Sequence, residues 1–217
     1  MCFSAAASFG GGIVISSIGV AAVKEANKPA QLAFASIPLL FGLQQIAEGF
    51  LWLTLPLETF SSVRTASMYA FLILARVIWP AMIPLSVLLM EEDHRRRRIL
   101  LVFLALGLTV SLYYAYCLAF LNVTPHIVDH HIQYHSDFPE ALATPVFIVY
   151  FIASITPLFV SGNKRTRLLG ALMSVSGVLS VIFFLHALTS VWCFFAAIIS
   201  IVVYWILRGH QSSCAGL

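Results

Sequence analysis

Long apolar runs separated by short polar segments dominate the hydrophobic pattern of this chain. A helix needs about 20 mostly apolar residues to cross the roughly 30 Å hydrocarbon core of a bilayer. Seven runs come close to that length: about Phe3–Val23, Ala30–Leu55, Ala66–Met90, Leu100–Phe120, Ala141–Val160, Leu168–Leu185 and Ala187–Leu207. The pattern therefore predicts an all-α integral membrane protein, a seven-helix bundle that forms a single transmembrane domain over residues 1–217.

The composition points the same way. Hydrophobic residues make up 60% of the chain and charged residues only 10%, whereas a soluble domain carries about 25% charged residues. A soluble fold could not cover so much apolar surface, so we expect the lipid bilayer as partner and the cell membrane as location (the inner membrane in a Gram-negative host). The net charge of +3 gives no reason to expect a nucleic-acid partner.

The basic residues predict an orientation, because short cytoplasmic loops collect lysine and arginine. With the N-terminus outside and the C-terminus in the cytoplasm, the inner segments hold ten of the twelve basic residues: Lys24, Lys28, Arg95, Arg96, Arg97, Arg98, Lys164, Arg165, Arg167 and Arg208. The charged run 91–98 is then a topology signal that faces anionic lipid headgroups.

Two charged residues fall inside the apolar runs, Glu48 in the second and Arg76 in the third. A charge at mid-bilayer costs about 2.5–3.5 kcal/mol on insertion scales and marks a candidate site with a partner nearby. Both residues lie about 10–15 Å from the outer end of their helices at 1.5 Å per residue. Because the two helices are consecutive and antiparallel, we expect a buried Glu48–Arg76 ion pair, which either lines a site or only fastens two helices together.

Further polar or helix-breaking residues surround this pair. Gln44 and Gln45 lie one turn before Glu48, and Pro80 and Pro84 interrupt the third run. Prolines in a span free backbone carbonyls, which is tolerated only against protein or water. This combination favours a lined cavity in the outer half of the bundle, with hydrogen bonding between helices as the alternative.

The segment between the fourth and fifth runs is rich in histidine. Thr124 as an N-cap, Pro125 at the first helical position and Pro139 as a stop predict a short outer helix. On such a helix the histidines form two pairs with i, i+4 spacing: His126 with His130, and His131 with His135.

Histidine pairs at this spacing can hold one divalent metal, most often zinc, and a catalytic zinc takes three protein ligands and one water. His186, expected at the outer end of the sixth run, or Glu48 would supply the third ligand. The protease signature HExxH is absent from the segment. A solvated loop that binds nothing and a histidine proton relay are the alternatives.

Several short motifs in the first half of the chain are shared with a known group of proteins. The opening Met1–Ala5 (Met-Cys-Phe-Ser-Ala), the pair Gln44-Gln45, Glu48-Gly49 and Trp79-Pro80 resemble a small uncharacterised family of bacterial multi-pass membrane proteins that open with Met-Cys-Phe-Ser. The resemblance implies the seven-span layout and places Cys2 and Glu48 in the pattern the family shares. It implies no activity.

Three functions remain open at this point. The first is a metal-dependent membrane hydrolase that acts on a lipid or small molecule at the outer side, with Glu48 as general base or ligand and Arg76 as counter-charge or anion clamp. The second is a small proton-coupled transporter that uses Glu48 and Arg76. The third is a pH or metal sensor, or a structural membrane subunit.

Overall fold

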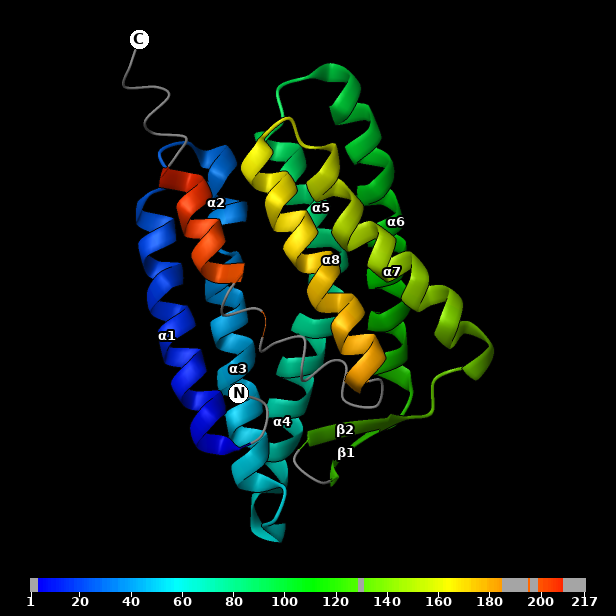
Figure 1. Cartoon of the computed structure of the whole chain (residues 1–217). Coiled ribbons are helices and arrows are strands. Elements are labelled where there is room, and N and C mark those ends of the chain that lie inside the picture. Colours follow the sequence, from blue (N-terminus) through cyan, green and yellow to red (C-terminus); the bar gives the residue numbers. More distant parts are fainter. Residues whose placement is uncertain (1–3, 129–130, 185–194, 196–198, 209–217) are drawn as a thin grey trace.

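The computed structural model describes residues 4–128, 131–184, 195 and 199–208, which form a helical bundle with one hairpin at its end (Figure 1). The elements are α1 (Ala5–Lys24), α2 (Pro29–Ala35), α3 (Ile37–Thr54), the 3-10 helix η1 (Glu58–Phe60), α4 (Ser61–Leu72), the π-helical segment η2 (Ile73–Ile78), α5 (Trp79–Met90), α6 (His94–Phe120), β1 (Val123–Val128), β2 (His131–Ser136), α7 (Glu140–Val160) and α8 (Lys164–Phe184). A further apolar helix covers Ile199–Arg208.

Five helical runs in the described part of the chain are long and apolar enough to cross a membrane: Ala5–Lys24, Pro29–Thr54, Ser61–Met90, His94–Phe120 and Glu140–Val160. They match the first five predicted spans. The sixth prediction coincides with most of α8, and the seventh ends in the shorter helix Ile199–Arg208. Residues 185–194 and 196–198 lie outside the description, so the count of seven spans and the orientation stay predictions.

The predicted outer helix is wrong, because the chain between α6 and α7 forms an antiparallel hairpin of β1 and β2. The all-α class is corrected accordingly. The segment is rich in β-branched residues, which pack well on a half-buried sheet. Buried Val123 and Ile132 lie on the hairpin face that packs on the bundle. Pro125, interpreted as a helix start, is equally compatible with a strand at the edge of a sheet.

Small residues bring α1 and α3 into close contact. A Cβ atom at Gly19 would lie 2.5 Å from the backbone nitrogen of Leu39, and one at Gly42 would collide with the side chain of Ser16. Without a hydrophobic driving force in lipid, such close backbone approach supplies the packing between membrane helices.

The third run is continuous in space but irregular, since α4, η2 and α5 follow one another without a loop. Pro80 and Pro84 have no N–H, so the carbonyls that would accept from them are left free. One of these is the carbonyl of Pro80, four residues before Pro84. A Cβ atom on Gly107 of α6 would collide with this oxygen. Glycine at position 107 therefore lets α6 pack directly against the irregular part of the third run around Pro80, called the break below.

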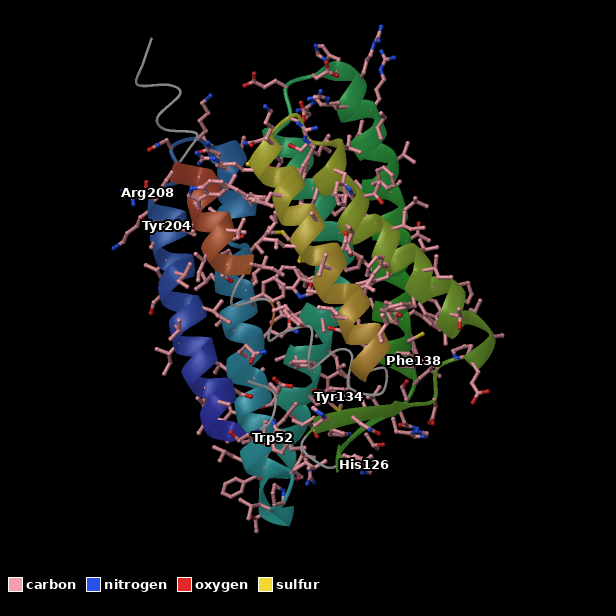
Figure 2. The ribbon with its side chains drawn as sticks, in the orientation of Figure 1. Trp52, His126, Tyr134, Phe138, Tyr204 and Arg208 are labelled. Carbon is pink, nitrogen blue, oxygen red and sulfur yellow. The ribbon has the colours of Figure 1, made fainter. Side chains whose placement is uncertain are left out.

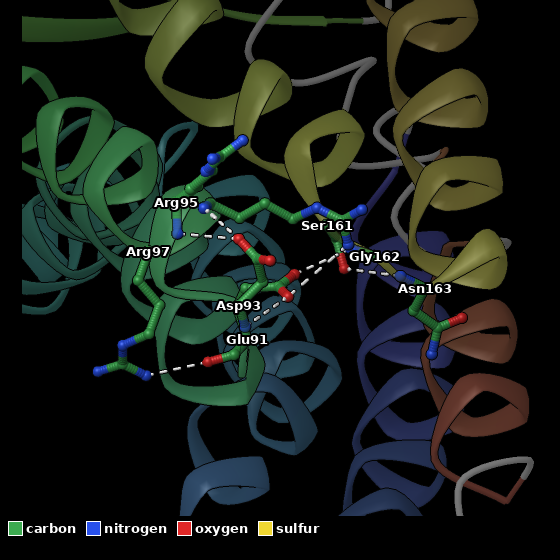
Figure 3. Close-up of polar contacts among 8 residues, drawn as sticks. Glu91, Asp93, Arg95, Arg97, Ser161, Gly162 and Asn163 are labelled. Atoms are coloured by element: carbon green, nitrogen blue, oxygen red, sulfur yellow. Dashed lines mark hydrogen bonds and ion pairs between the residues drawn. The ribbon is translucent and has the colours of Figure 1, made fainter.

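At the end of the bundle opposite the hairpin, Glu91 joins two turns (Figures 1 and 3). Its Oε2 accepts a hydrogen bond from the N–H of Gly162 at 2.9 Å, and its Oε1 lies 3.8 Å from Nη1 of Arg96. Arg97 donates to the carbonyls of Leu88 and Glu91 at 3.1 and 3.0 Å. The α5–α6 turn is thereby fixed to the α7–α8 turn.

Replacing Gly107 by alanine should destabilise the bundle, because the new methyl group meets the Pro80 carbonyl. Overpacking of this kind costs about 1–3 kcal/mol. The control is Gly10→Ala in α1, where an added Cβ meets nothing within 4 Å and helix propensity favours alanine by up to about 1 kcal/mol. Unfolding free energies of both variants in detergent micelles test this; equal stabilities would contradict the close contact of α6 with Pro80.

Asp93, the N-cap of α6, should give folding stability a pH dependence. Hydrogen bonds from the backbone N–H groups of Arg96 (2.9 Å) and Arg95 (2.8 Å) hold the pKa of Asp93 below its ordinary value. A lowered folded pKa means that the carboxylate stabilises the folded state above about pH 4 and that this is lost as the pH falls through the folded pKa. The melting temperature of Asp93→Asn should therefore fall less than that of the wild type between about pH 6 and pH 3. Parallel declines would contradict this.

Candidate functional site

A cavity of about 360 Å³ lies between α3, the broken third run, α6, α7 and α8. Its walls are mainly aromatic and apolar, with a few polar groups. The lining residues are Phe41, Gln44, Ala75, Arg76, Trp79, Ile83, Tyr113, Tyr114, Ser136, Phe138, Glu140, Ala143, Phe147, Tyr150, Ser154, Met173 and Ile199. Concave, largely apolar sites with a few polar groups are the usual form of small-molecule pockets.

Arg76 supplies the positive charge of this cavity from within η2. Its guanidinium carbon lies 5.6 Å from the ring centre of Tyr114 and 5.1 Å from that of Phe138. Each desolvated cation–π contact is worth up to about 2 kcal/mol, against about 2.5–3.5 kcal/mol for a charge at mid-bilayer. Two rings can therefore hold the guanidinium without a fixed carboxylate. Within the described ranges Arg76 makes no ion pair and no hydrogen bond.

The expected ion pair between Glu48 and Arg76 is not formed. Glu48 is fully buried in α3 but is not among the residues that line the cavity. Arg76 lies in a π-helical segment, where one extra residue per turn changes the face on which the following side chains lie. The arginine therefore faces α6 and the segment after the hairpin, a direction that regular helical spacing did not predict.

The predicted cavity lined by glutamine is confirmed for Gln44. Its Oε1 accepts a hydrogen bond from Nε1 of Trp79 at 2.8 Å, and the ring of Trp79 stacks on Phe41 with centres 4.0 Å apart. Gln45 is fully buried and lies outside the cavity lining. The hydrogen bond orients the indole, so α3 and α5 share one aromatic wall of the cavity.

Side-chain hydroxyls of neighbouring helices donate hydrogen bonds to backbone carbonyls of the broken third run. In the π-helical segment the amide five residues after Ala75 belongs to Pro80 and has no N–H. The hydroxyl of Tyr150 in α7 donates to the Ala75 carbonyl at 2.7 Å, and that of Ser111 in α6 donates to the Val77 carbonyl at 2.6 Å. These two bonds attach α6 and α7 to the break beside Arg76.

The contribution of α7 to the cavity is a stripe along one helical face. Glu140, Ala143, Phe147, Tyr150 and Ser154 follow one another at intervals of three or four residues, which places them on the same side. At 1.5 Å per residue the stripe is about 21 Å long. The cavity is therefore narrow and elongated, parallel to the helix axis.

The hairpin and the segment after it cover one end of the cavity. Figure 2 shows Tyr134 and Phe138 on the bundle side of the hairpin and His126 on the opposite side. Tyr134 stacks on Phe71 of α4 with ring centres 5.3 Å apart. Ser136 and Phe138 line the cavity itself. Because Phe138 lies beside the guanidinium of Arg76, the positive charge is near this covered end.

The histidines predicted to bind metal are arranged differently from the prediction. In the hairpin register His126, His131 and His135 share the face that carries Gln133. His131 and His135 are about 13 Å apart along the strand, at about 3.3 Å per residue, so they cannot hold one ion together. Across the described residues, no group of three His, Cys, Asp or Glu side chains is placed to hold a metal. His130 and His186 lie outside the described residues, and the zinc site stays a prediction.

Sequence reasoning missed most of the cavity lining. The sequence analysis did not single out Tyr114, Phe138, Tyr150 or Ser154, all of which line the cavity. One available signal was the spacing of polar or aromatic residues along the fifth run, since Phe147, Tyr150 and Ser154 repeat on one helical face. The π-helical segment itself leaves no comparable sequence signal beyond the two prolines.

Replacing Tyr150 by phenylalanine should destabilise the protein by about 1–3 kcal/mol, because the Ala75 carbonyl loses its donor inside the bundle. The matched control is Tyr116→Phe in α6, where the side chain is 61% exposed. Unfolding free energies measured in detergent micelles distinguish the two. If both variants unfold like the wild type, the attachment of α7 to the break is not a stabilising contact.

Comparison with known proteins identifies a family but no activity. No curated protein and no solved structure matches the chain. The model of a family described as "Family of unknown function (DUF6629)" matches residues 1–215. The match agrees with the resemblance to an uncharacterised family noted from the opening motif. The chain therefore belongs to this family of unknown function, DUF6629.

Proposed function

We propose that this protein is a small carrier of the cell membrane that binds a single-chain organic anion in the cavity beside Arg76, with the hairpin end outside and the basic end in the cytoplasm. One observation carries the proposal: the guanidinium of Arg76 lines a mainly apolar cavity and makes no ion pair or hydrogen bond with any described residue. Arginine has five N–H donors in a geometry that suits carboxylates.

The charge of the cavity favours a monoanion. Among the described lining residues Arg76 is the single cation, and the single carboxylate, Glu140, is exposed at the start of α7, where water screens its charge. A dianionic phosphate would bring one uncompensated negative charge into a site of low dielectric, where charge–charge energies are large. A carboxylate is matched by the one guanidinium.

The shape of the cavity favours one narrow chain. Its volume of about 360 Å³ is at the small end of the roughly 300–1,000 Å³ of ligand pockets, too small for a lipid with two acyl chains. The 21 Å stripe of α7, at about 1.5 Å per residue, gives such a chain room to extend. The cavity residues Ile83, Met173 and Ile199 provide apolar contacts for its tail.

The broken third run supports carriage rather than hydrolysis. Transporters commonly bind substrate where a membrane helix is interrupted, since irregular backbone at membrane depth is stable only beside protein or a cavity. Of the three functions considered from the sequence, the hydrolase and the transporter both use Arg76, but transport needs no metal site. The metal-dependent hydrolase gains no support from the described residues.

Decanoate is a suitable probe for this site. The wild-type protein in nanodiscs should bind radiolabelled decanoate saturably, and Arg76→Gln should weaken the binding at least tenfold, because a charge-assisted hydrogen bond is worth about 1.5–3 kcal/mol. The matched control is Arg64→Gln in α4, which removes the same charge outside the cavity lining. Decanol, which is neutral, should be insensitive to Arg76→Gln. Absence of saturable decanoate binding, or equal affinity of Arg76→Gln and wild type, would contradict the proposed function.

A further inference from the structure

We propose that Ser154 determines the specificity of this cavity and selects anions whose tail carries a hydroxyl or oxo group. The inference rests on the proposed function and names the substrate class more closely. Ser154 lies in α7, lines the cavity and is 2% exposed. Its hydroxyl has no hydrogen-bond partner among the described residues.

A buried serine without a partner is unusual for the helices of this protein. Serine and threonine in membrane helices normally donate back to a carbonyl one turn earlier. In this structure the following residues do so: Ser17, Thr54, Ser86, Thr109, Ser174, Ser176 and Ser180. Ser16 and Thr166 also lack a partner within the described ranges, but neither lines the cavity. Ser154 alone among the described lining residues combines burial with an unused hydroxyl.

The position of Ser154 fixes which part of a guest it meets. The guanidinium of Arg76 lies beside Phe138, which comes just before the start of α7 at Glu140. It also lies 5.6 Å from the ring centre of Tyr114, which is 6.4 Å from that of Tyr150 in α7. Ser154 lies four residues beyond Tyr150, about 6 Å further along the axis of α7 at 1.5 Å per residue. A guest whose carboxylate binds Arg76 therefore reaches Ser154 with its tail. A purely hydrocarbon tail would leave this hydroxyl unsatisfied, and a hydroxyl or oxo group would complete its hydrogen bonding.

The experiment compares decanoate with decanoates hydroxylated near the carboxylate, at mid-chain or at the far end, on the full-length protein in nanodiscs. We expect at least one isomer hydroxylated at mid-chain or at the far end to bind about tenfold more tightly than decanoate, as one satisfied buried hydrogen bond implies. The isomer hydroxylated near the carboxylate should show no such gain. In Ser154→Ala the preference should disappear while decanoate binds as in the wild type.

Ser180→Ala is the matched control, because Ser180 is fully buried and its hydroxyl donates to the Ser176 carbonyl at 2.8 Å. This variant should keep the preference and melt below the wild type, whereas Ser154→Ala should melt at or above it. The inference is overturned if no isomer binds more tightly than decanoate, or if the preference survives in Ser154→Ala. Decanoate binding that depends on Arg76 but shows no preference would overturn the role of Ser154 alone; absence of saturable binding by every probe would overturn the proposed function too.

Discussion

Backbone carbonyls that lose their donors inside a membrane helix must find others, because lipid offers none. In the third run Pro80 and Pro84 remove two N–H groups, and the neighbouring helices α6 and α7 contact the carbonyls that lose these donors. Tyr150 donates to Ala75, and Gly107 lets α6 approach the Pro80 carbonyl. The arrangement of α6 and α7 around the break is thus a consequence of satisfying the broken backbone.

The same break places the charge. Arg76 lies within the π-helical segment, and its guanidinium is held by the rings of Tyr114 and Phe138 instead of by a carboxylate. Cation–π contacts stabilise the cation while leaving its N–H donors open to an anion. A fixed ion pair would have neutralised the arginine inside the protein. An ion pair would only connect two helices, whereas a guanidinium held by cation–π contacts can still bind an anion.

The sequence predicted the fold correctly where a single physical constraint determines the structure. The hydrocarbon thickness sets the length of an apolar run. The five helical runs long and apolar enough to cross a membrane agree with prediction within a few residues at most boundaries, although α6 begins six residues earlier, at His94, where Asp93 caps it. It failed where two interpretations compete, because Pro125 and the i, i+4 histidines fit a helix as well as an edge strand. The hairpin forms because it buries Val123 and Ile132 on one face against the bundle.

The candidate site could be foreseen only in part for a related reason. Glu48 and Arg76 were correctly identified as residues that need an explanation inside the bilayer, but their partners depend on helix rotation. A π-helical segment changes that rotation, and single-residue spacing cannot reveal it. Gln44 was foreseen because it lies in regular helix α3, where one turn of spacing is reliable.

The most direct test of a chain-shaped anion site is quenching of Trp79, which is 5% exposed and lines the cavity. Of the four tryptophans, the other three, Trp52, Trp192 and Trp205, would be replaced by phenylalanine. An acid with a bromine on its chain should quench the remaining fluorescence saturably, and unbrominated decanoate should restore it. Quenching that rises in proportion to the brominated acid in the bilayer, without saturation or competition, would contradict a bound guest in the cavity.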